Sequence, residues 1–198
     1  MPYSNFTFKK AKKDFGLTEI NTDLFANAVE IPISEWLKKT LTISAKIPLR
    51  SEKARSEGIV APVLFELRER NTDKIALFSG ENLDVDAQAG LNGECDFILT
   101  KNPLSTTIES PIFCLAEAKQ HIVENSLGQM TAQMVGARKF NKIEGTDIET
   151  IFGAVTTGEL WQFLKLDGNK VYTDTTRHYI GNPDKLLGIL QCIVDFYC

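Results

Sequence analysis

The sequence lacks several features that would place it in a simple class. No apolar run approaches the roughly 20 residues that a membrane-spanning helix needs, and no basic start precedes an apolar stretch near Met1. We therefore expect neither a membrane span nor a secretory signal peptide. Charge of one sign is also not in excess, because 22 Lys and Arg stand against 26 Asp and Glu, for a net charge of −4. The overall charge thus gives no indication of nucleic-acid binding, although a local basic patch could still bind nucleic acid.

Cysteine is scarce, and its placement argues against a zinc ribbon. The four cysteines are scattered along the chain as Cys95, Cys114, Cys192 and Cys198. No pair has the Cys-x-x-Cys spacing of a structural zinc site. Cys95 and Cys114 lie an odd number of residues from Asp96 and Glu117, so on strands they should face away from those carboxylates and into the core. We expect both thiols to be reduced and buried, which favours a cytoplasmic protein.

What the chain does contain is an ordinary globular composition. Its 198 residues are 43% hydrophobic and 24% charged, which is enough for one sizeable core. We expect residues 51–198 to form the main domain and residues 1–50 to form an N-terminal helical extension packed on it. Ser34 should cap a short helix within this extension.

Apolar periodicity predicts the main helices. An amphipathic helix is predicted over 51–70, where Pro62 should cause a kink or a boundary. Two further helices are predicted over 123–140 and 183–197. Asn182 has the side chain of a helix N-cap, and a proline follows it at the first helical position.

The extended segments between these helices predict the fold class. They are 74–79, 83–86, 93–100, 112–118, 151–156, 160–166 and 170–172, with a turn at 80–82. Runs of strands separated by helices predict an α/β fold with a central mixed β-sheet flanked by helices on both faces. The connection from Ala118 through the second helix to Ile151 should form a βαβ unit with parallel strands.

Charged residues next to two apolar segments mark the candidate site. Asp96 precedes an apolar run, and Glu117 and Lys119 end another. Successive side chains alternate along a strand, so Glu117 and Lys119 project from the same face. Buried carboxylates and amines need partners or a metal, and pairing of the two strands would bring all three groups together. Two carboxylates suit Mg²⁺ or Mn²⁺, and the backbone carbonyl of Ala118 could add a third oxygen.

Lys119 beside such an ion could orient or deprotonate an attacking water, or neutralise developing negative charge. A bare Glu-x-Lys is weak evidence, because about one is expected by chance in a chain of this length. A solvated ion pair between Glu117 and Lys119 is the alternative. The context strengthens the metal hypothesis, because Asp96 lies 21 residues upstream of Glu117 (117 minus 96) and a Gln-bearing helix follows.

Taken together, these residues give a chain that resembles the PD-(D/E)XK nuclease superfamily. Asp96 stands where this family has its first metal-binding Asp, preceded here by Gly93-Glu94-Cys95 rather than by Pro. Glu117-Ala118-Lys119 matches the (D/E)-x-K element itself. The resemblance covers about residues 51–166 and implies a restriction-endonuclease-like αβββαβ core. It further implies Mg²⁺-dependent hydrolysis of phosphodiester bonds in nucleic acid, with DNA as the expected substrate.

The resemblance also assigns roles outside the two strands. The segment 51–64 looks like the first core helix of restriction-type members, where an acidic residue completes the metal site; Glu52 fits, and Glu57 competes with it. Gln129 looks like the Gln that many members carry after the Lys, and the Tyr of some branches is Gln133 here. The implied catalytic residues are Asp96, Glu117, Lys119 and Gln129. The implied metal ligands are Asp96, Glu117, Ala118 and either Glu52 or Glu57.

Other interpretations remain open. A catalytically inactive module of the same fold could bind nucleic acid or a protein partner, and a metalloenzyme other than a nuclease could use the same carboxylates. Association as a homodimer is also left open. His121 follows the motif and could act as a general base, but a loop histidine that packs or touches phosphate is favoured. His178 is expected at the surface, whereas Trp161 and Phe163 are expected in the core.

Overall fold

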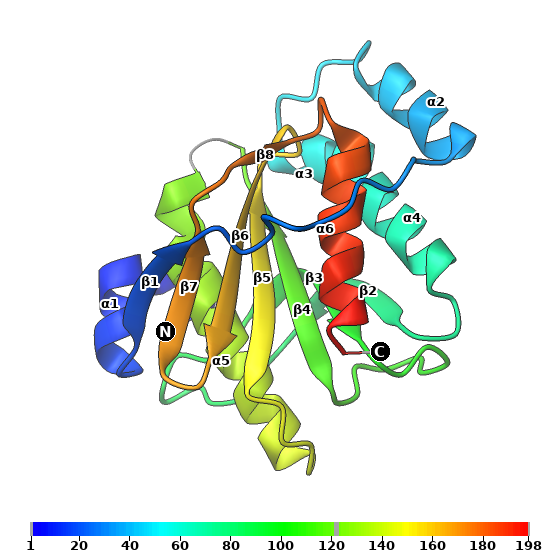
Figure 1. Cartoon of the computed structure of the whole chain (residues 1–198). Helices are drawn as coiled ribbons and strands as arrows, with labels where there is room; N and C mark the ends of the chain where they lie inside the picture. Colours follow the sequence, from blue (N-terminus) through cyan, green and yellow to red (C-terminus); the bar gives the residue numbers. More distant parts are fainter. Residues whose placement is uncertain (1, 121–122, 198) are drawn as a thin grey trace.

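A computed structural model describes residues 2–120 and 123–197 of the chain. In that part of the protein, eight strands form one mixed sheet (Figure 1). The strands are β1 Thr18–Thr22, β2 Ala76–Asn82, β3 Glu94–Thr100, β4 Ile112–Ala118, β5 Thr150–Thr156, β6 Leu160–Asp167, β7 Lys170–Asp174 and β8 His178–Tyr179. Their order is β1-β7-β6-β5-β4-β3-β2, and β8 pairs with β6.

Helices cover both faces of this sheet, which confirms the predicted α/β fold class. The α-helices are α1 Phe8–Asp14, α2 Glu35–Ser44, α3 Glu52–Arg55, α4 Ala61–Arg70, α5 Leu127–Ile143 and α6 Pro183–Asp195. In Figure 1, α6 lies in front of the sheet and α5 behind it. One hydrophobic core joins α4 and α6 to the front face, and a second joins α1 and α5 to the back. No helix in the described residues has the length and apolar composition needed to cross a membrane.

The connection between β4 and β5 is the predicted βαβ unit. These two strands are parallel, and α5 joins them after a short 3₁₀ turn at Val123–Ser126. The β2–β3 and β3–β4 pairs are antiparallel. Elements α4, β2, β3, β4, α5 and β5 therefore follow one another in the order helix, three strands, helix, strand.

The helical segment over 51–70 breaks where Pro62 predicts a break. A π-helical turn at Ser56–Val60 separates α3 from α4. Proline has no N–H, so residue 62 cannot donate to the carbonyl of Gly58, four residues earlier. The Ser44 hydroxyl of α2 donates to that carbonyl at 2.7 Å instead. The break therefore fixes the C-terminal end of α2 against this turn.

Two predicted boundaries around β2 are wrong. The strand continues through residues 80–82, where a turn was expected, because Glu81 and Asn82 still pair with β3. Gly80 allows this by adopting a positive φ of 69° that other residues rarely take. Residues 83–86 form no strand and contribute only an isolated bridge from Asp86 to Leu91.

The N-terminal segment is more than a helical extension. Strand β1 pairs in parallel with β7 and so forms an edge of the main sheet. Helix α1 and the preceding 3₁₀ turn at Tyr3–Asn5 pack on α5. The Tyr3 hydroxyl donates to the carbonyl of Leu83 at 2.8 Å, 80 residues away. The expected helical extension over 1–50 therefore also contributes a strand, and the helix capped by Ser34 is confirmed.

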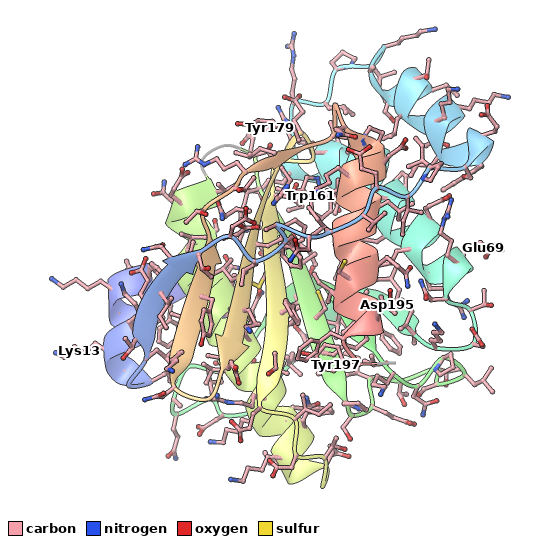
Figure 2. The ribbon with its side chains drawn as sticks, in the orientation of Figure 1. Lys13, Glu69, Trp161, Tyr179, Asp195 and Tyr197 are labelled. Atoms are coloured by element: carbon pink, nitrogen blue, oxygen red, sulfur yellow. The ribbon has the colours of Figure 1, made fainter. Side chains whose placement is uncertain are left out.

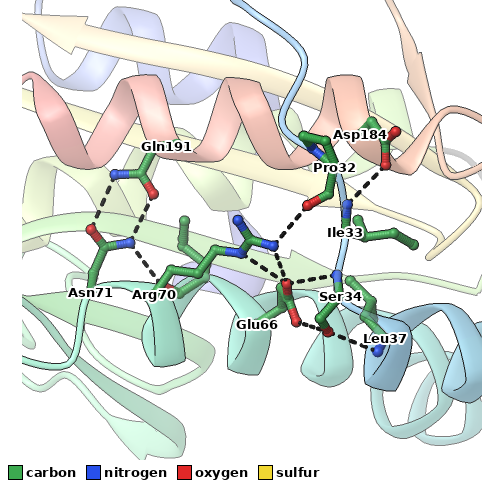
Figure 3. A network of polar contacts seen from close by, with 10 residues as sticks. Pro32, Ile33, Ser34, Leu37, Glu66, Arg70, Asn71, Asp184 and Gln191 are labelled. Carbon is green, nitrogen blue, oxygen red and sulfur yellow. Dashed lines mark hydrogen bonds and ion pairs between the residues drawn. The ribbon is translucent and has the colours of Figure 1, made fainter.

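A polar network attaches the start of α2 to α4 (Figure 3). The buried carboxylate of Glu66 accepts hydrogen bonds from the backbone N–H and the hydroxyl of Ser34, at 3.0 and 2.5 Å. Arg70 donates to the same carboxylate at 2.8 Å and to the carbonyl of Pro32 at 2.7 Å. Burial would raise the pKa of Glu66, but the Ser34 and Arg70 contacts outweigh it and lower that pKa.

Several side chains outside the candidate site are as expected, and one is not. Trp161 and Phe163 are fully buried in the front core, with Trp161 labelled beside the sheet in Figure 2. Cys95 and Cys114 are free and buried, as predicted. His178, expected at the surface, is buried with its Nε2 3.0 Å from an Asp174 carboxylate oxygen. Strand β8 pairs with β6 and turns this ring toward Phe163.

Candidate active site

Strands β3 and β4 bring Asp96 and Glu117 together. The register pairs Phe97 with Ala116, so continuing it by one residue sets Asp96 opposite Glu117. An Asp96 carboxylate oxygen accepts the backbone N–H of Ala118 at 2.7 Å. Glu117 is only 3% exposed, although it is charged. Two acidic side chains thus face each other at the end of a buried strand pair.

This proximity changes the acidity of Asp96. Burial, followed by the charge of Glu117, raises the pKa of the Asp96 carboxyl to about 7. The Ala118 N–H and Lys119 act in the opposite direction, and Glu52 adds to the increase. Like charges directly across a strand pair are destabilising, so a cation that lies between the carboxylates should bind favourably.

The Glu117 carboxylate is held by three side-chain donors. Lys119 Nζ donates to its Oε1 at 2.8 Å, and Gln129 Nε2 donates to the same oxygen. Gln133 Nε2 donates to Oε2 at 2.9 Å. Gln129 and Gln133 lie one turn apart on α5 and therefore share a face. Gln129 therefore lies in the site, as expected. Gln133 lies there too, and its position four residues after Gln129 is the sequence feature that could have predicted this.

Lys119 lies where strand β4 ends, and it is a cation there. Its backbone N–H donates to the carbonyl of Thr156 at 2.7 Å, which extends the pairing with β5. Burial alone would lower the pKa of the Lys119 amine, but the charge and hydrogen bond of Glu117 outweigh it, and the pKa is raised. A raised pKa suits a charge-neutralising ammonium better than a general base.

A pocket of about 550 Å³ opens beside Asp96. It is lined by Glu52, Lys53, Ser56, Glu57, Ser79, Gly80, Glu94, Asp96 and Ala118. Four of these side chains are carboxylates and one is an amine, so the pocket is strongly acidic. Glu94 is an addition that sequence reasoning missed, although it directly precedes Cys95 in the same segment. Gly80, which faces Asp96 across the β2–β3 register, leaves the pocket open on that side.

Of the two competing helix carboxylates, Glu52 lies nearer the centre. Its charge raises the pKa of both Asp96 and Lys119, and it accepts the backbone N–H of Gln120 at 3.3 Å. The Glu57 side chain is 68% exposed and forms an ion pair with Lys53 at 3.7 Å. Glu57 lines the same pocket but makes no such contact with the Asp96 and Glu117 pair.

The oxygen donors present fit Mg²⁺ or Mn²⁺ in kind, because both ions prefer carboxylate and carbonyl ligands. Within residues 2–120 and 123–197, no group of three or more His, Cys, Asp and Glu side chains is already arranged around a metal position. Both oxygens of Glu117 are occupied by hydrogen-bond donors. Oε2 accepts only one of these bonds, from Gln133, and therefore keeps a lone pair that could bind a metal ion. His121, the candidate general base, lies outside the described residues.

Sequence comparison assigns no family to this chain. The family models searched give no match, and no curated protein matches it. The observation from which a function can be inferred is therefore the arrangement of Asp96, Glu117 and Lys119, with Asp96 also lining the acidic pocket.

Proposed function

We propose that this protein is a metal-dependent nuclease of the PD-(D/E)XK superfamily that hydrolyses phosphodiester bonds, with DNA as its substrate. The observation that carries the proposal is the pair of facing carboxylates, Asp96 and Glu117, with the Lys119 ammonium bonded to one of them. The order of α4, β2, β3, β4, α5 and β5 also agrees with the αβββαβ core that such an enzyme has.

Each residue of the site has its own role in the proposed reaction. Asp96, Glu117, Glu52 and the Ala118 carbonyl would hold Mg²⁺ or Mn²⁺, and Glu57 would stay at the pocket rim. The ion, when bound, lowers the pKa of a water ligand and offsets negative charge on the phosphate. The Lys119 ammonium neutralises charge that develops on the phosphate during attack. Gln129 and Gln133 orient Glu117 through its two oxygens.

Cleavage assays with a matched lysine control test this proposal. Wild type, Lys119→Ala and Lys74→Ala are incubated with linear duplex, circular duplex and single-stranded DNA and with RNA, in Mg²⁺ or in chelator. Lys74 is exposed and makes no contact with the site. We expect cleavage of DNA in Mg²⁺ alone, unchanged in Lys74→Ala and slowed at least about a hundredfold in Lys119→Ala. Absence of cleavage by wild type, or equal cleavage by Lys119→Ala, contradicts the proposal.

One observation favours a second candidate, a catalytically inactive module of the same fold. Lys119, Gln129 and Gln133 together occupy both Glu117 oxygens, which is also how a carboxylate is stabilised without a metal. Such a module would bind nucleic acid or a protein partner and cut nothing. Retention of DNA by wild type with no cleavage in either Mg²⁺ or Mn²⁺ would support this candidate over the nuclease.

A cytoplasmic location belongs to the proposal as well. Cys95 and Cys114 are free thiols in the interior, and reduced cysteines are typical of reducing compartments. A nuclease with this site would also find Mg²⁺ and nucleic acid there.

A further inference from the structure

A second cavity, of about 770 Å³, lies next to the carboxylate pocket. Its walls come from the end of α2, the segment that leads to α3, the π-helical turn and the residues around β8. Half of the twelve lining residues are aliphatic, namely Leu41, Ala45, Ile47, Leu49, Ile59 and Ile180. A concave, mostly apolar space of this size with few polar groups is typical of a site for a small ligand or for one unit of a polymer.

Gln120 connects this cavity to the candidate active site. It directly follows Lys119 and lines the cavity. Its backbone N–H donates to Glu52 at 3.3 Å, and its side-chain amide donates to the carbonyl of Arg50 at 2.7 Å. A polymer bound with one phosphate at Lys119 can therefore extend a neighbouring unit into the cavity.

The charge of the cavity is opposite to that of the pocket beside it. Arg50 and Arg55 line it, against one carboxylate, Glu159. Arg55 donates to the carbonyl of Thr157 at 2.9 Å, which holds its guanidinium at the wall. Its buried Nε has no hydrogen-bond partner among the described residues. Arg55 also forms an ion pair with Glu159 at 3.5 Å. Arg50 therefore supplies the remaining positive charge among the lining residues, which can attract a phosphate group.

We propose, on the basis of the nuclease function above, that this cavity binds an unpaired nucleotide of the substrate strand adjacent to the cleaved bond. The base lies against the aliphatic wall formed by Ile47, Leu49 and Ile59, and Arg50 contacts its phosphate. This site is open to solvent, since Ile47 on its wall is 52% exposed. A base that is still stacked in a duplex has no free face to lay on this wall, so the site selects single-stranded or unpaired positions. The substrate class is therefore nucleic acid with unpaired nucleotides rather than continuous duplex.

Filling the cavity tests this inference with a control that the chain provides. Ile47 and Ile43 are similarly exposed, at 52% and 54%, but only Ile47 lines the cavity. We expect Ile47→Trp to weaken binding of a short fluorescent oligothymidylate about tenfold or more, whereas Ile43→Trp leaves it unchanged. Arg50→Ala should weaken binding similarly, and Lys46→Ala, an exposed cation outside the lining, should not. All variants should keep the wild-type melting temperature.

Binding is measured in chelator, so the result does not depend on cleavage. Equal binding by Ile47→Trp and wild type overturns the inference, even if wild type is an active nuclease. An equal loss of affinity for single strands and for duplex in Ile47→Trp overturns it as well. A loss of affinity for single strands alone in Ile47→Trp supports the inference. This holds even if wild type cuts no substrate, because absence of cleavage contradicts the proposed function and not the binding site.

Discussion

At the scale of single residues, the facing carboxylates are the feature that separates this site from an ordinary strand end. Sequence alternation could predict that Glu117 and Lys119 share a face, and that Asp96 approaches them if the strands pair. It could not predict that Gln133 takes the second oxygen of Glu117, because that contact depends on how α5 lies on the sheet. Glu94 joins the pocket for a similar reason, since the path of β2 decides which side chains line it.

The raised pKa of Asp96 predicts a pH dependence of stability. The folded protein holds the Asp96 proton up to a pKa of about 7, against 3.8 for the unfolded chain. The free energy of unfolding that this carboxyl contributes is therefore fully present below pH 3.8, and it is lost as the pH rises through about 7. Asp96→Asn keeps an acceptor for the Ala118 N–H without the charge. At a pH of about 8 we expect this variant to be roughly 2–4 kcal/mol more stable to denaturant than wild type.

The control for this measurement is Asp73→Asn, which changes an exposed carboxylate away from the site. It should follow the wild-type curve of stability against pH. If Asp96→Asn follows that curve too, Asp96 does not titrate abnormally and the electrostatic description of the site is wrong.

At the scale of elements, the interrupted helix shows what the sequence can and cannot predict. Pro62 predicts the break in the 51–70 segment because proline lacks an N–H. It does not predict the π-helical turn. Nor does it predict that the Ser44 hydroxyl donates to the Gly58 carbonyl, because Ser44 belongs to another helix. The same limit applies to β2, where residues 80–82 resemble a turn but continue the strand because β3 offers partners for them.

The Ser44 contact predicts a coupling with Pro62. Ser44→Ala leaves the Gly58 carbonyl without its donor, which should cost about 1–2 kcal/mol in unfolding free energy. In a Pro62→Ala background, residue 62 regains an N–H that can bond Gly58 within the helix. The cost of Ser44→Ala should then fall toward zero in a double-mutant cycle measured by denaturant unfolding. Equal costs in both backgrounds would show that the hydroxyl does not replace the missing helical bond.

At the scale of the whole molecule, the N-terminal segment is part of the structure that supports the site. Composition and patterning predicted the fold class and the parallel β4–β5 crossover. The pairing of β1 with β7 could not be predicted, because strands about 150 residues apart carry no local signal for each other. Tyr3 and Phe6 lie against α5, the helix that presents Gln129 and Gln133 to Glu117. Substitutions that displace the N-terminal segment should therefore also displace Gln129 and Gln133 beside Glu117.

Substitution of Gly128 tests this docking. A Cβ atom at Gly128 would lie 2.2 Å from the carbonyl oxygen of Phe6, so the N-terminal segment must move. Although Gly→Ala in a helix normally stabilises by about 1 kcal/mol, we expect Gly128→Ala to destabilise by about 1–3 kcal/mol. Gly181→Ala, where nothing lies within 4 Å of the new atom, is the control for thermal unfolding. A neutral or stabilising effect of Gly128→Ala would mean that the N-terminal segment is not docked there.

Metal binding tests the central claim, that Asp96 and Glu117 form one cation site. The measurement is the melting temperature of wild type, Asp96→Ala and Asp73→Ala, each with and without Mn²⁺. A ligand that binds only the folded state raises its stability according to concentration and affinity. We predict a rise in melting temperature for wild type and for Asp73→Ala, and none for Asp96→Ala. No rise in wild type, or the same rise in Asp96→Ala, would contradict the account.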